Sequence, residues 1–413
     1  MFGLLGAGRT RVENPNPGRD AESTLRCCEQ LGALVTRSID AIELEGRDGA
    51  LAEPEGVLDC GNSGTTLRLL SGIVASQAFV SVLSGDASLN RRPVARIREP
   101  LVQMGATLWA RGGDAFPPLS IRGAKLRGID YALPVASAQV ASCILLAGLG
   151  AEGTTTVRIP GPARDHTERM LKGLGVRLTV TAEGAGRSVS LAGASRFSGT
   201  SLRVPGDPSA AAFMLAAAAI TPGARVTARG VSVNATRTGF LDALEAMGAT
   251  VERVIAGDAA GEPAADVTVQ GPERLRAIEL PDAWLPRMID EVPVWAIVAA
   301  CAQGTSRLTG AGELRVKESD RLAAICRNLS LLGVETHEQA SGFEVTGGKV
   351  RGGSIDAEGD HRIAMAFTIL ATVAGGPIVI DGAEGIGTSD PAFIGTFNAL
   401  GGHASWHVHG GTR

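Results

Sequence analysis

One short pattern recurs six times along the chain and limits what it can fold into. Each copy is an amphipathic helical stretch that ends in Leu-Gly or Met-Gly and runs into a strand-like segment. The glycines are Gly32, Gly105, Gly175, Gly248, Gly333 and Gly401, at successive spacings of 73, 70, 73, 85 and 68 residues. Glycine directly after the last helical residue is a common helix stop, because it adopts the left-handed conformation without steric cost. Six copies at nearly constant spacing predict a repeated α/β supersecondary unit.

A second kind of segment lies between these copies: a polar turn that opens a highly apolar helix. It occurs at residues 61–65 (GNSGT), 136–139 (ASAQ), 206–209 (GDPS), 288–291 (MIDE) and 359–362 (GDHR). Because the helices that follow are apolar on most faces, we expect them to be buried, with the sheets outside them. Grouping the six units by three predicts two α/β domains, residues 1–206 and 207–413.

The first unit is incomplete at its start. Residues 1–12 resemble the second half of a buried helix followed by its turn and strand, and the polar opening expected roughly thirty residues before Gly32 is absent. We interpret the first helix as lacking its N-terminal part. The alternative is a degenerate terminal repeat, which is common in repeat proteins.

Composition argues against several classes of function. The formal net charge of −4 provides no overall positive field for nucleic acid. The aromatic content of 4%, with a single tyrosine, does not favour a base-stacking surface. No stretch approaches the ~20 apolar residues that span a bilayer. Six cysteines without a Cys-x-x-Cys pair predict reduced thiols in a cytoplasmic protein.

The polar openings present unpaired backbone N–H groups and a partial positive charge, so they are candidate anion sites. Ordinary helix capping explains any single turn of this kind, and charged neighbours favour the anion-binding interpretation. The candidate residues are Asn62, Ser63, Gly64, Thr65 and Arg68, then Ser137, Ala138 and Gln139, and finally His361 and Arg362.

Charged residues gather near these openings in three places. They are Arg91, Arg92, Arg96 and Arg98; Lys317, Glu318 and Arg321; and Asp290 and Glu291. We interpret Arg96 and Arg98 as a solvated face. Lys317 and Arg321 are four residues apart, which predicts one shared helical face. A surface ion-pair cluster is the alternative for that group, and a simple N-cap is the alternative for Asp290.

Taken in order, these motifs resemble the 5-enolpyruvylshikimate-3-phosphate (EPSP) synthase family. The matching segments are residues 61–65, 92–93, 137–139, 164–169 (RDHTER), 206–209, 289–291, 314–321 (LRVKESDR) and 360–362. The resemblance covers essentially the whole chain. It implies the two-domain enolpyruvyl transferase fold, with three α/β units in each domain.

The resemblance implies transfer of the enolpyruvyl group of phosphoenolpyruvate to the 5-hydroxyl of shikimate 3-phosphate, with release of phosphate, by a monomer that needs no cofactor or metal. It implies that shikimate 3-phosphate is held by Ser137, Ala138, Gln139, Arg164, Asp290 and Lys317. It implies that phosphoenolpyruvate is surrounded by Asn62, Gly64, Arg92, Glu318, Arg321, His361 and Arg362.

The chemistry of this reaction asks for such residue types. Carbon 3 of phosphoenolpyruvate must be protonated while a hydroxyl adds at carbon 2, and the adduct then loses phosphate. Glu318 beside Lys317 is the candidate acid–base group for carbon 3, and Asp290 the candidate acceptor of the hydroxyl proton. Arginines offset the phosphate and carboxylate charge. His403, His407 and His409 fall in a strand-like C-terminal tail, where metal binding is the weaker interpretation.

Three departures from the family pattern keep other functions open. The Lys-Ser-x-Ser-x-Arg opening has no counterpart, Ala141 stands where many relatives carry Lys, and Thr388 and Asp390 replace a Lys and an aromatic residue. One alternative is therefore an impaired homologue that binds a phosphorylated ligand. The related transferase acting on UDP-N-acetylglucosamine is disfavoured, because residues 90–93 (NRRP) lack its loop cysteine. A non-enzymatic α/β scaffold leaves the charged cluster unexplained.

Overall fold

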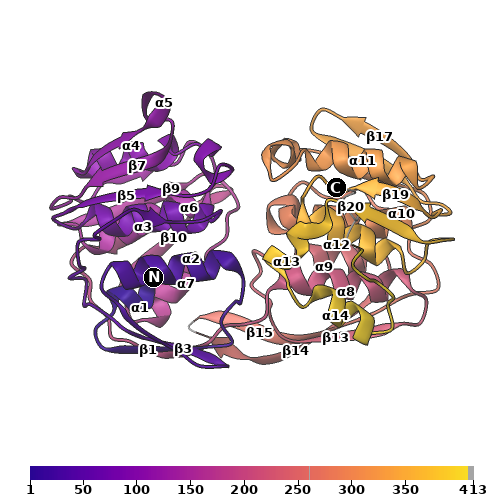
Figure 1. Ribbon diagram of the computed structural model, residues 1–413, viewed down its shortest axis with the longest axis horizontal. Helices are drawn as coiled ribbons and strands as arrows, with labels where there is room; N and C mark the ends of the chain where they lie inside the picture. Colours follow the sequence, from indigo (N-terminus) through magenta and orange to yellow (C-terminus); the bar gives the residue numbers. More distant parts are fainter. Residues whose placement is uncertain (260, 408–413) are drawn as a thin grey trace, which may run out of the picture. The chain divides into compact units, whose positions relative to one another are not determined.

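The computed structural model describes residues 1–259 and 261–407, and the chain divides into two compact units (Figure 1). Unit 1 comprises Met1–Pro205 together with Asp258–Glu262, and unit 2 comprises Gly206–Gly257 with Pro263–Arg413. The small insertion comes from the adjoining ends of β14 (Thr250–Ala259) and β15 (Glu262–Gln270), so the chain passes between the units three times. The repeat pattern in the sequence does not indicate that residues of the β14–β15 hairpin belong to unit 1.

Unit 1 contains three four-stranded sheets that share one topology. The first strand pairs in parallel with the second, which pairs antiparallel with the third, which pairs antiparallel with the fourth. In that order the sheets are β12 (Ser201–Arg203), β1 (Arg9–Glu13), β3 (Ala41–Glu45) and β2 (Leu34–Arg37); β4 (Leu58–Asp59), β5 (Val80–Ser84), β7 (Phe116–Arg122) and β6 (Thr107–Ala110); and β8 (Asp130–Ala132), β9 (Thr154–Ile159), β11 (Gly186–Ala192) and β10 (Leu178–Glu183).

The two longest apolar helices of unit 1, α3 (Gly64–Ala75) and α6 (Ala138–Leu149), pack against each other in its core. A side-chain carbon at Gly72 would lie only 2.1 Å from the carbonyl oxygen of Cys143, so the two backbones are in direct contact. The other helices are α1 (Phe2–Leu5), α2 (Arg19–Gln30), η1 (Leu89–Arg91), α4 (Ala95–Met104), α5 (Arg111–Asp114) and α7 (His166–Gly173).

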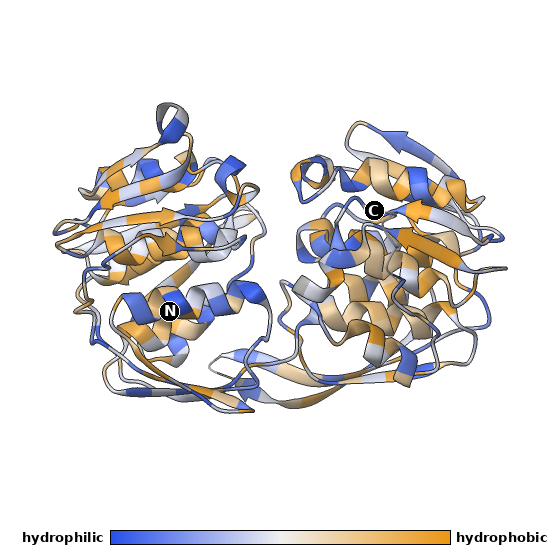
Figure 2. Ribbon diagram, in the orientation of Figure 1, coloured by the Kyte–Doolittle hydropathy of each residue, from blue (hydrophilic) through white to orange (hydrophobic). Residues whose placement is uncertain are grey.

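Unit 2 repeats this plan around the apolar helices α8 (Pro208–Ile220), α10 (Val292–Ala300) and α12 (His361–Leu370), which Figure 2 shows mostly in hydrophobic colours. Its strands are β13 (Arg225–Ser232), β14 and β15; β16 (Thr305–Leu308), β17 (Glu335–Gln339) and β18 (Gly342–Thr346); and β19 (Gly353–Asp356) and β20 (Ile378–Asp381). The remaining helices are α9 (Gly239–Ala246), η2 (Leu285–Arg287), η3 (Ile289–Glu291), η4 (Gly312–Val316), α11 (Arg321–Leu331), η5 (Ala383–Gly385), α13 (Ile386–Ser389) and α14 (Phe393–Ala399).

The predicted helix stops are confirmed. All six repeat glycines adopt positive φ angles, between 80° for Gly175 and 115° for Gly105. A side chain would be strained in this region, which explains why glycine recurs there. The buried helices and outer sheets also agree with the sequence pattern, since every residue of α10 is buried.

The predicted strand after the sixth glycine is wrong, and so is the strand-like tail that would carry His403 and His407. Residues 402–407 contain no strand, and His409 lies outside the described residues. The physical reason is local: the side chain of Asn398 bonds both main-chain groups of Ala404, at 2.8 Å each. These groups are therefore satisfied without a neighbouring strand.

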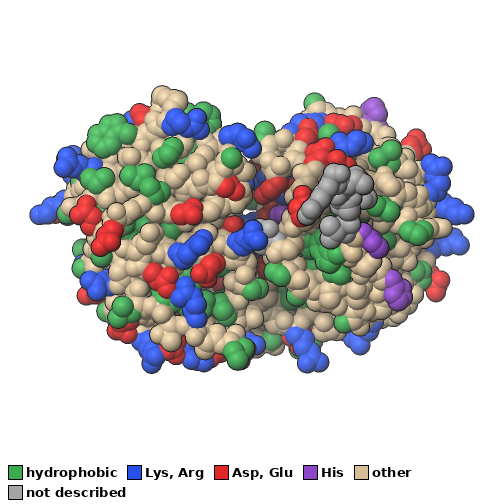
Figure 3. Space-filling model, in the orientation of Figure 1, with side chains coloured by type: hydrophobic (Ala, Val, Ile, Leu, Met, Phe, Trp, Pro, Cys, Tyr) green, Lys and Arg blue, Asp and Glu red, His purple; other side chains and the backbone are tan. Residues whose placement is uncertain are grey.

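Positive and negative side chains are interspersed over the face shown in Figure 3, in keeping with the small net charge. In the part of the chain that the structure describes, no helix is both long and apolar enough to cross a membrane. Within the same residues, no three His, Cys, Asp or Glu side chains are grouped as a metal site would require.

Candidate active site

In unit 1, the predicted residues other than Arg92 and Arg164 lie at the starts of the two packed helices α3 and α6. Ser63 caps α3 by accepting a hydrogen bond from the Thr66 N–H at 3.1 Å, and Ser137 caps α6 by accepting one from the Val140 N–H at 3.4 Å. Ala138 is the first residue of α6. Because the helices pack side by side, both N-termini contribute to one region of unit 1.

A chain of side-chain bonds joins these two helix starts. Arg68 donates from Nη1 to Oε1 of Gln139 at 2.7 Å, and Gln139 donates from Nε2 to Oγ1 of Thr65 at 2.9 Å. A side-chain carbon at Gly64 would lie 2.7 Å from Nη1 of Arg68 and 3.4 Å from Nη1 of Arg92, so glycine leaves room for both guanidinium groups. Burial lowers the pKa of Arg68, and the positive charges of Arg92 and Arg96 lower it further. Positive charge is thus concentrated where an anion would be stabilised.

Arg92 is oriented through Asn62 by Asp86, a residue that the sequence analysis missed. Its Nη2 donates to Oδ1 of Asn62 at 2.8 Å, and Asn62 in turn donates from Nδ2 to Oδ2 of Asp86 at 2.7 Å. Asp86 also accepts the Leu89 N–H at 2.7 Å, which fixes its own carboxylate. No local pattern around Asp86 could have indicated this role, since its partner lies 24 residues earlier.

Arg164 lies in the loop that precedes α7, apart from the α3 and α6 starts in sequence. Its carbonyl oxygen accepts a bond from Nη2 of Arg187 at 3.1 Å, and the same nitrogen pairs with the buried Glu168 at 2.7 Å. Arg187 therefore anchors the main chain of this loop.

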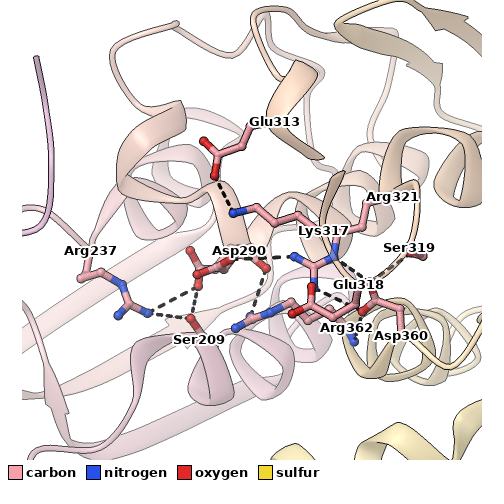
Figure 4. A network of polar contacts seen from close by, with 11 residues as sticks. Ser209, Arg237, Asp290, Glu313, Lys317, Glu318, Ser319, Arg321, Asp360 and Arg362 are labelled. Carbon is pink, nitrogen blue, oxygen red and sulfur yellow. Dashed lines mark hydrogen bonds and ion pairs between the residues drawn. The ribbon is translucent and has the colours of Figure 1, made fainter. Parts of the chain in front are cut away.

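In unit 2, the predicted charged residues converge on Arg321, whose side chain is only 1% exposed (Figure 4). Its Nε donates to Oδ2 of Asp360 at 2.8 Å, and its Nη2 donates to Oε2 of Glu318 at 2.7 Å. Its Nη1 lies 3.8 Å from Oδ1 of Asp290. This Nη1 is buried and has no hydrogen-bond partner among the described residues. One buried cation thus holds both candidate acid–base groups.

Asp360 supports this arrangement and was assigned no role from the sequence. It is fully buried, caps α12 by accepting the Arg362 N–H at 2.9 Å, and accepts the Ser319 hydroxyl at 3.1 Å. Burial raises its pKa, but the ion pair with Arg321 outweighs burial, so the pKa is lowered overall. Its position at the start of an apolar helix is the signal that could have found it.

The first two residues of α12, His361 and Arg362, differ in charge. Arg362 donates from Nη1 to the carbonyl oxygen of Asp290 at 3.1 Å. Burial lowers the pKa of Arg362, but the carboxylates of Asp290 and Glu291 outweigh it, so the pKa is raised overall. Burial, followed by the charge of Arg362, lowers the pKa of His361 to about 4. His361 is therefore a neutral imidazole at neutral pH.

The predicted shared helical face of Lys317 and Arg321 is wrong. The helix η4 ends at Val316 and α11 begins at Arg321, and Lys317 has ψ of −148°, which is not helical. Lys317 instead pairs with Glu313 at 2.6 Å. The reading of Asp290 as an N-cap is also wrong, because Glu291 occupies that position of α10 without a side-chain cap.

A hollow of about 650 Å³ in unit 1 lies elsewhere. It is lined by the loop before α2, the start of α2 and the β2–β3 turn, and includes Arg11, Arg37 and Arg203. It contains none of the predicted site residues.

Comparison with known proteins agrees with the motifs. A family model described as EPSP synthase (3-phosphoshikimate 1-carboxyvinyltransferase) matches residues 1–397. A 3-phosphoshikimate 1-carboxyvinyltransferase of Bacillus subtilis (strain 168) is 44% identical over 403 residues, which cover 97% of this chain and 93% of the relative. One of Synechococcus sp. (strain JA-3-3Ab) is 45% identical over 405 residues, covering 97% and 90%.

A solved structure of EPSP synthase from Acinetobacter baumannii superposes with a TM-score of 0.89 at 43% identity, covering 97% of this chain and 92% of that one. The similarity to a solved member confirms the predicted fold class. The chain therefore belongs to the EPSP synthase (3-phosphoshikimate 1-carboxyvinyltransferase) family, whose members carry out enolpyruvyl transfer in the shikimate pathway.

Proposed function

We propose that this chain binds shikimate 3-phosphate and phosphoenolpyruvate and transfers the enolpyruvyl group through the residues described above. In unit 1, Ser137, Ala138, Gln139 and Arg164 bind shikimate 3-phosphate, and Asn62, Gly64, Thr65, Arg68 and Arg92 bind anionic groups of the substrates. In unit 2, Asp290, Lys317, Glu318 and His361 act at the reacting atoms, while Arg321 and Arg362 bind phosphoenolpyruvate.

The observation that carries this proposal is the environment of Arg321. It is buried, it pairs with Glu318 at 2.7 Å, and it keeps an unsatisfied Nη1 within 3.8 Å of Asp290. A buried N–H donor without a hydrogen-bond partner is costly, so this Nη1 favours a ligand that brings an acceptor, such as a phosphate or carboxylate oxygen.

In the first half of the reaction, Asp290 accepts the proton of the 5-hydroxyl as its oxygen bonds to carbon 2 of phosphoenolpyruvate, and Glu318 delivers a proton to carbon 3. In the second half, carbon 3 returns its proton to Glu318, the bond from carbon 2 to the phosphate oxygen breaks, and the departing phosphate takes up the proton held by Asp290. Arg321 and Arg362 stabilise the negative charge throughout, as fixed donors in a buried site. The neutral His361 serves as a hydrogen-bonding group.

Lys317 must be redirected for its role. In the structure its ammonium group is held by the exposed Glu313. A surface pair of this kind contributes at most about 1 kcal/mol, so a substrate phosphate can readily replace it. We further propose that the chain acts as a cytoplasmic monomer that needs no cofactor, and light scattering of the purified protein tests its oligomeric state.

The proposal is tested by mixing the protein with both substrates and following phosphate release. We expect Glu318→Gln to lower kcat by about 100-fold or more, because general acid–base groups typically contribute 10²–10⁴-fold, while the Kd for shikimate 3-phosphate stays within about threefold. Glu313→Gln is the matched control. Among the residues of Figure 4, Glu313 pairs with Lys317, so this variant should leave kcat nearly unchanged.

One competing function is tested by the same experiment: an impaired homologue that binds a phosphorylated ligand. An impaired homologue would bind shikimate 3-phosphate, as measured by calorimetry, without releasing phosphate. That result from a folded protein would reject the proposed catalysis and leave only the ligand-binding function.

A further inference from the structure

A buried polar chain of three side chains ends at the residue next to Asp290. Arg237, in the loop between β13 and α9, donates from Nη2 to the hydroxyl of Ser209 at 2.6 Å. Ser209, in the first turn of α8, donates in turn to Oε1 of Glu291. Glu291 is only 2% exposed and follows Asp290 directly in η3. Figure 4 shows this chain reaching the Asp290 region from the side opposite Asp360.

The direction of these bonds is fixed by chemistry. A guanidinium group has only donors, so Ser209 must accept from Arg237 and has its single proton left for Glu291. Arg237 also pairs with Asp207, the N-cap of α8, at 3.3 Å, and lies 3.8 Å from Glu291. The chain therefore has one arrangement of protons and holds the Glu291 side chain in one orientation.

Two buried atoms of this chain are left without hydrogen bonds. In the described residues, neither Oε2 of Glu291 nor Nε of Arg237 has a partner. Burial raises the pKa of Glu291, as expected for a carboxyl group that is incompletely solvated. An arrangement selected for stability alone would satisfy or replace such groups, so their retention points to a role in the site.

The main chain at Asp290 is held from both sides. Arg362 donates to the carbonyl oxygen of Asp290 at 3.1 Å, and the Glu291 side chain anchors the following residue to α8. The turn η3 is only three residues long and is held by a main-chain bond from the Glu291 N–H to the Met288 carbonyl oxygen at 2.9 Å. Together with the ion pair from Arg321 to the Asp290 carboxylate, these two main-chain anchors therefore limit where that carboxylate points.

We infer that Arg237, Ser209 and Glu291 form a positioning chain that aligns Asp290 for accepting the hydroxyl proton of shikimate 3-phosphate. The inference rests on the proposed function of Asp290. None of the three residues contacts the reacting atoms, so each acts through Asp290. Loss of the chain leaves Asp290 in place but lets its carboxylate leave the reactive orientation.

The test compares Ser209→Ala with wild type. Alanine suits the first turn of a helix, and Asp207 still caps α8 through the main-chain N–H of residue 209, so we expect the variant to fold. We expect kcat to fall by about 10- to 100-fold, as misplacement of a catalytic group by about 1 Å does, while KM for both substrates stays within about threefold. Because partial unfolding also lowers the apparent kcat without changing KM, kcat is calculated per folded enzyme, with the folded fraction taken from the denaturation curve of each variant.

Ser306→Ala is the matched control, because Ser306 is also fully buried in unit 2 and accepts a hydrogen bond from the Ile278 N–H, but lies in β16. It should lower Tm while leaving kcat nearly unchanged.

A second pair of variants tests the Glu291 carboxylate. Glu291→Gln keeps an oxygen that accepts the hydrogen bond from Ser209, so it should be at least about tenfold more active than Glu291→Ala.

The outcomes separate this inference from the proposed function. If wild type releases no phosphate, the proposed function fails before the variants are compared. If wild type turns over and Ser209→Ala keeps its kcat, or if Glu291→Gln and Glu291→Ala are equally active, the positioning chain is rejected and the proposed function stands. A loss of kcat in Ser209→Ala with rescue by Glu291→Gln relative to Glu291→Ala supports it.

Discussion

His361 stands at the first position of α12, where four charged side chains act on its imidazole. Arg362 and Arg321 disfavour its protonated form, while Asp360 and Glu318 favour it. Burial of the imidazole has the largest effect and acts in the same direction as the two arginines. Together they lower the pKa of His361 from 6.5 to about 4. The histidine thus adds no positive charge to this site at neutral pH.

This neutral histidine makes stability depend on pH. Between pH 4 and 6.5 the unfolded chain binds a proton at His361 that the folded chain does not, so stability falls as the pH is lowered from 6.5 to 4. We expect His361→Asn to remove this part of the loss, which is on the order of 3 kcal/mol at most. Urea unfolding at several pH values measures it.

The exposed His337 of β17 provides the control. His337→Asn should keep the wild-type loss of stability between pH 6.5 and 4. An unchanged pH dependence in His361→Asn would contradict the buried neutral state of His361.

At the scale of elements, the contact between α3 and α6 sets the geometry of the unit 1 site. Both helices carry site residues at their starts, and Arg68 and Gln139 join them only 2.7 Å apart. The packing that allows this is the backbone contact between Gly72 and Cys143.

We therefore expect Gly72→Ala to destabilise unit 1 by about 1–3 kcal/mol or more, since the added carbon would overlap main-chain atoms that can yield only if a helix moves. The same shift separates the two helix starts, so KM for shikimate 3-phosphate should rise. Denaturant unfolding and steady-state kinetics measure the two effects.

Gly395 in α14 is the matched control, because it is exposed and a side-chain carbon there meets no atom within 4 Å. Gly395→Ala should be neutral or stabilising by up to about 1 kcal/mol. Equal stability of wild type and Gly72→Ala would show that the helices can adjust without cost.

At the scale of the whole molecule, the chain has two separate hydrophobic cores. One is built from residues between Leu4 and Phe197, the other from residues between Ala212 and Phe397. Each unit thus has the core of a domain that can open independently.

We expect hydrogen exchange of Gly72→Ala to reveal this independence. Amides of α3 and α6 should exchange at least about tenfold faster than in wild type, because a loss of about 1.4 kcal/mol in local stability is a tenfold change in opening. Amides of α10 and α12 should be nearly unaffected. Equal acceleration in all four helices would show that the two cores unfold together.

Much of this architecture could be predicted because its determinants are local. Each repeat glycine ends a helix because its own positive φ angle favours glycine, which is a local property. Each apolar helix is likewise encoded by one continuous run of apolar residues. Local patterns also located Glu318, Arg321 and Asp290 as charged groups near helix starts. They failed for residues 317–320, where non-helical main chain separates two helices.

The remaining parts depend on contacts between distant residues. Arg237 is 28 residues from Ser209, and Ser209 is 82 residues from Glu291, so no periodicity connects them. Asp86 and Asn62 are likewise joined only in the folded chain. Such polar chains are determined by tertiary packing, which spacing alone does not describe.

The insertion of Asp258–Glu262 into unit 1 has a practical consequence for dissecting the protein. In that insertion, Glu262 bonds to Nδ1 of His166 at 2.7 Å, and the Gly261 carbonyl oxygen accepts a bond from Arg169. A fragment ending at Pro205 would lose these two contacts of α7. Genetic splitting of this enzyme at its apparent midpoint should therefore give two halves that are soluble only when produced together.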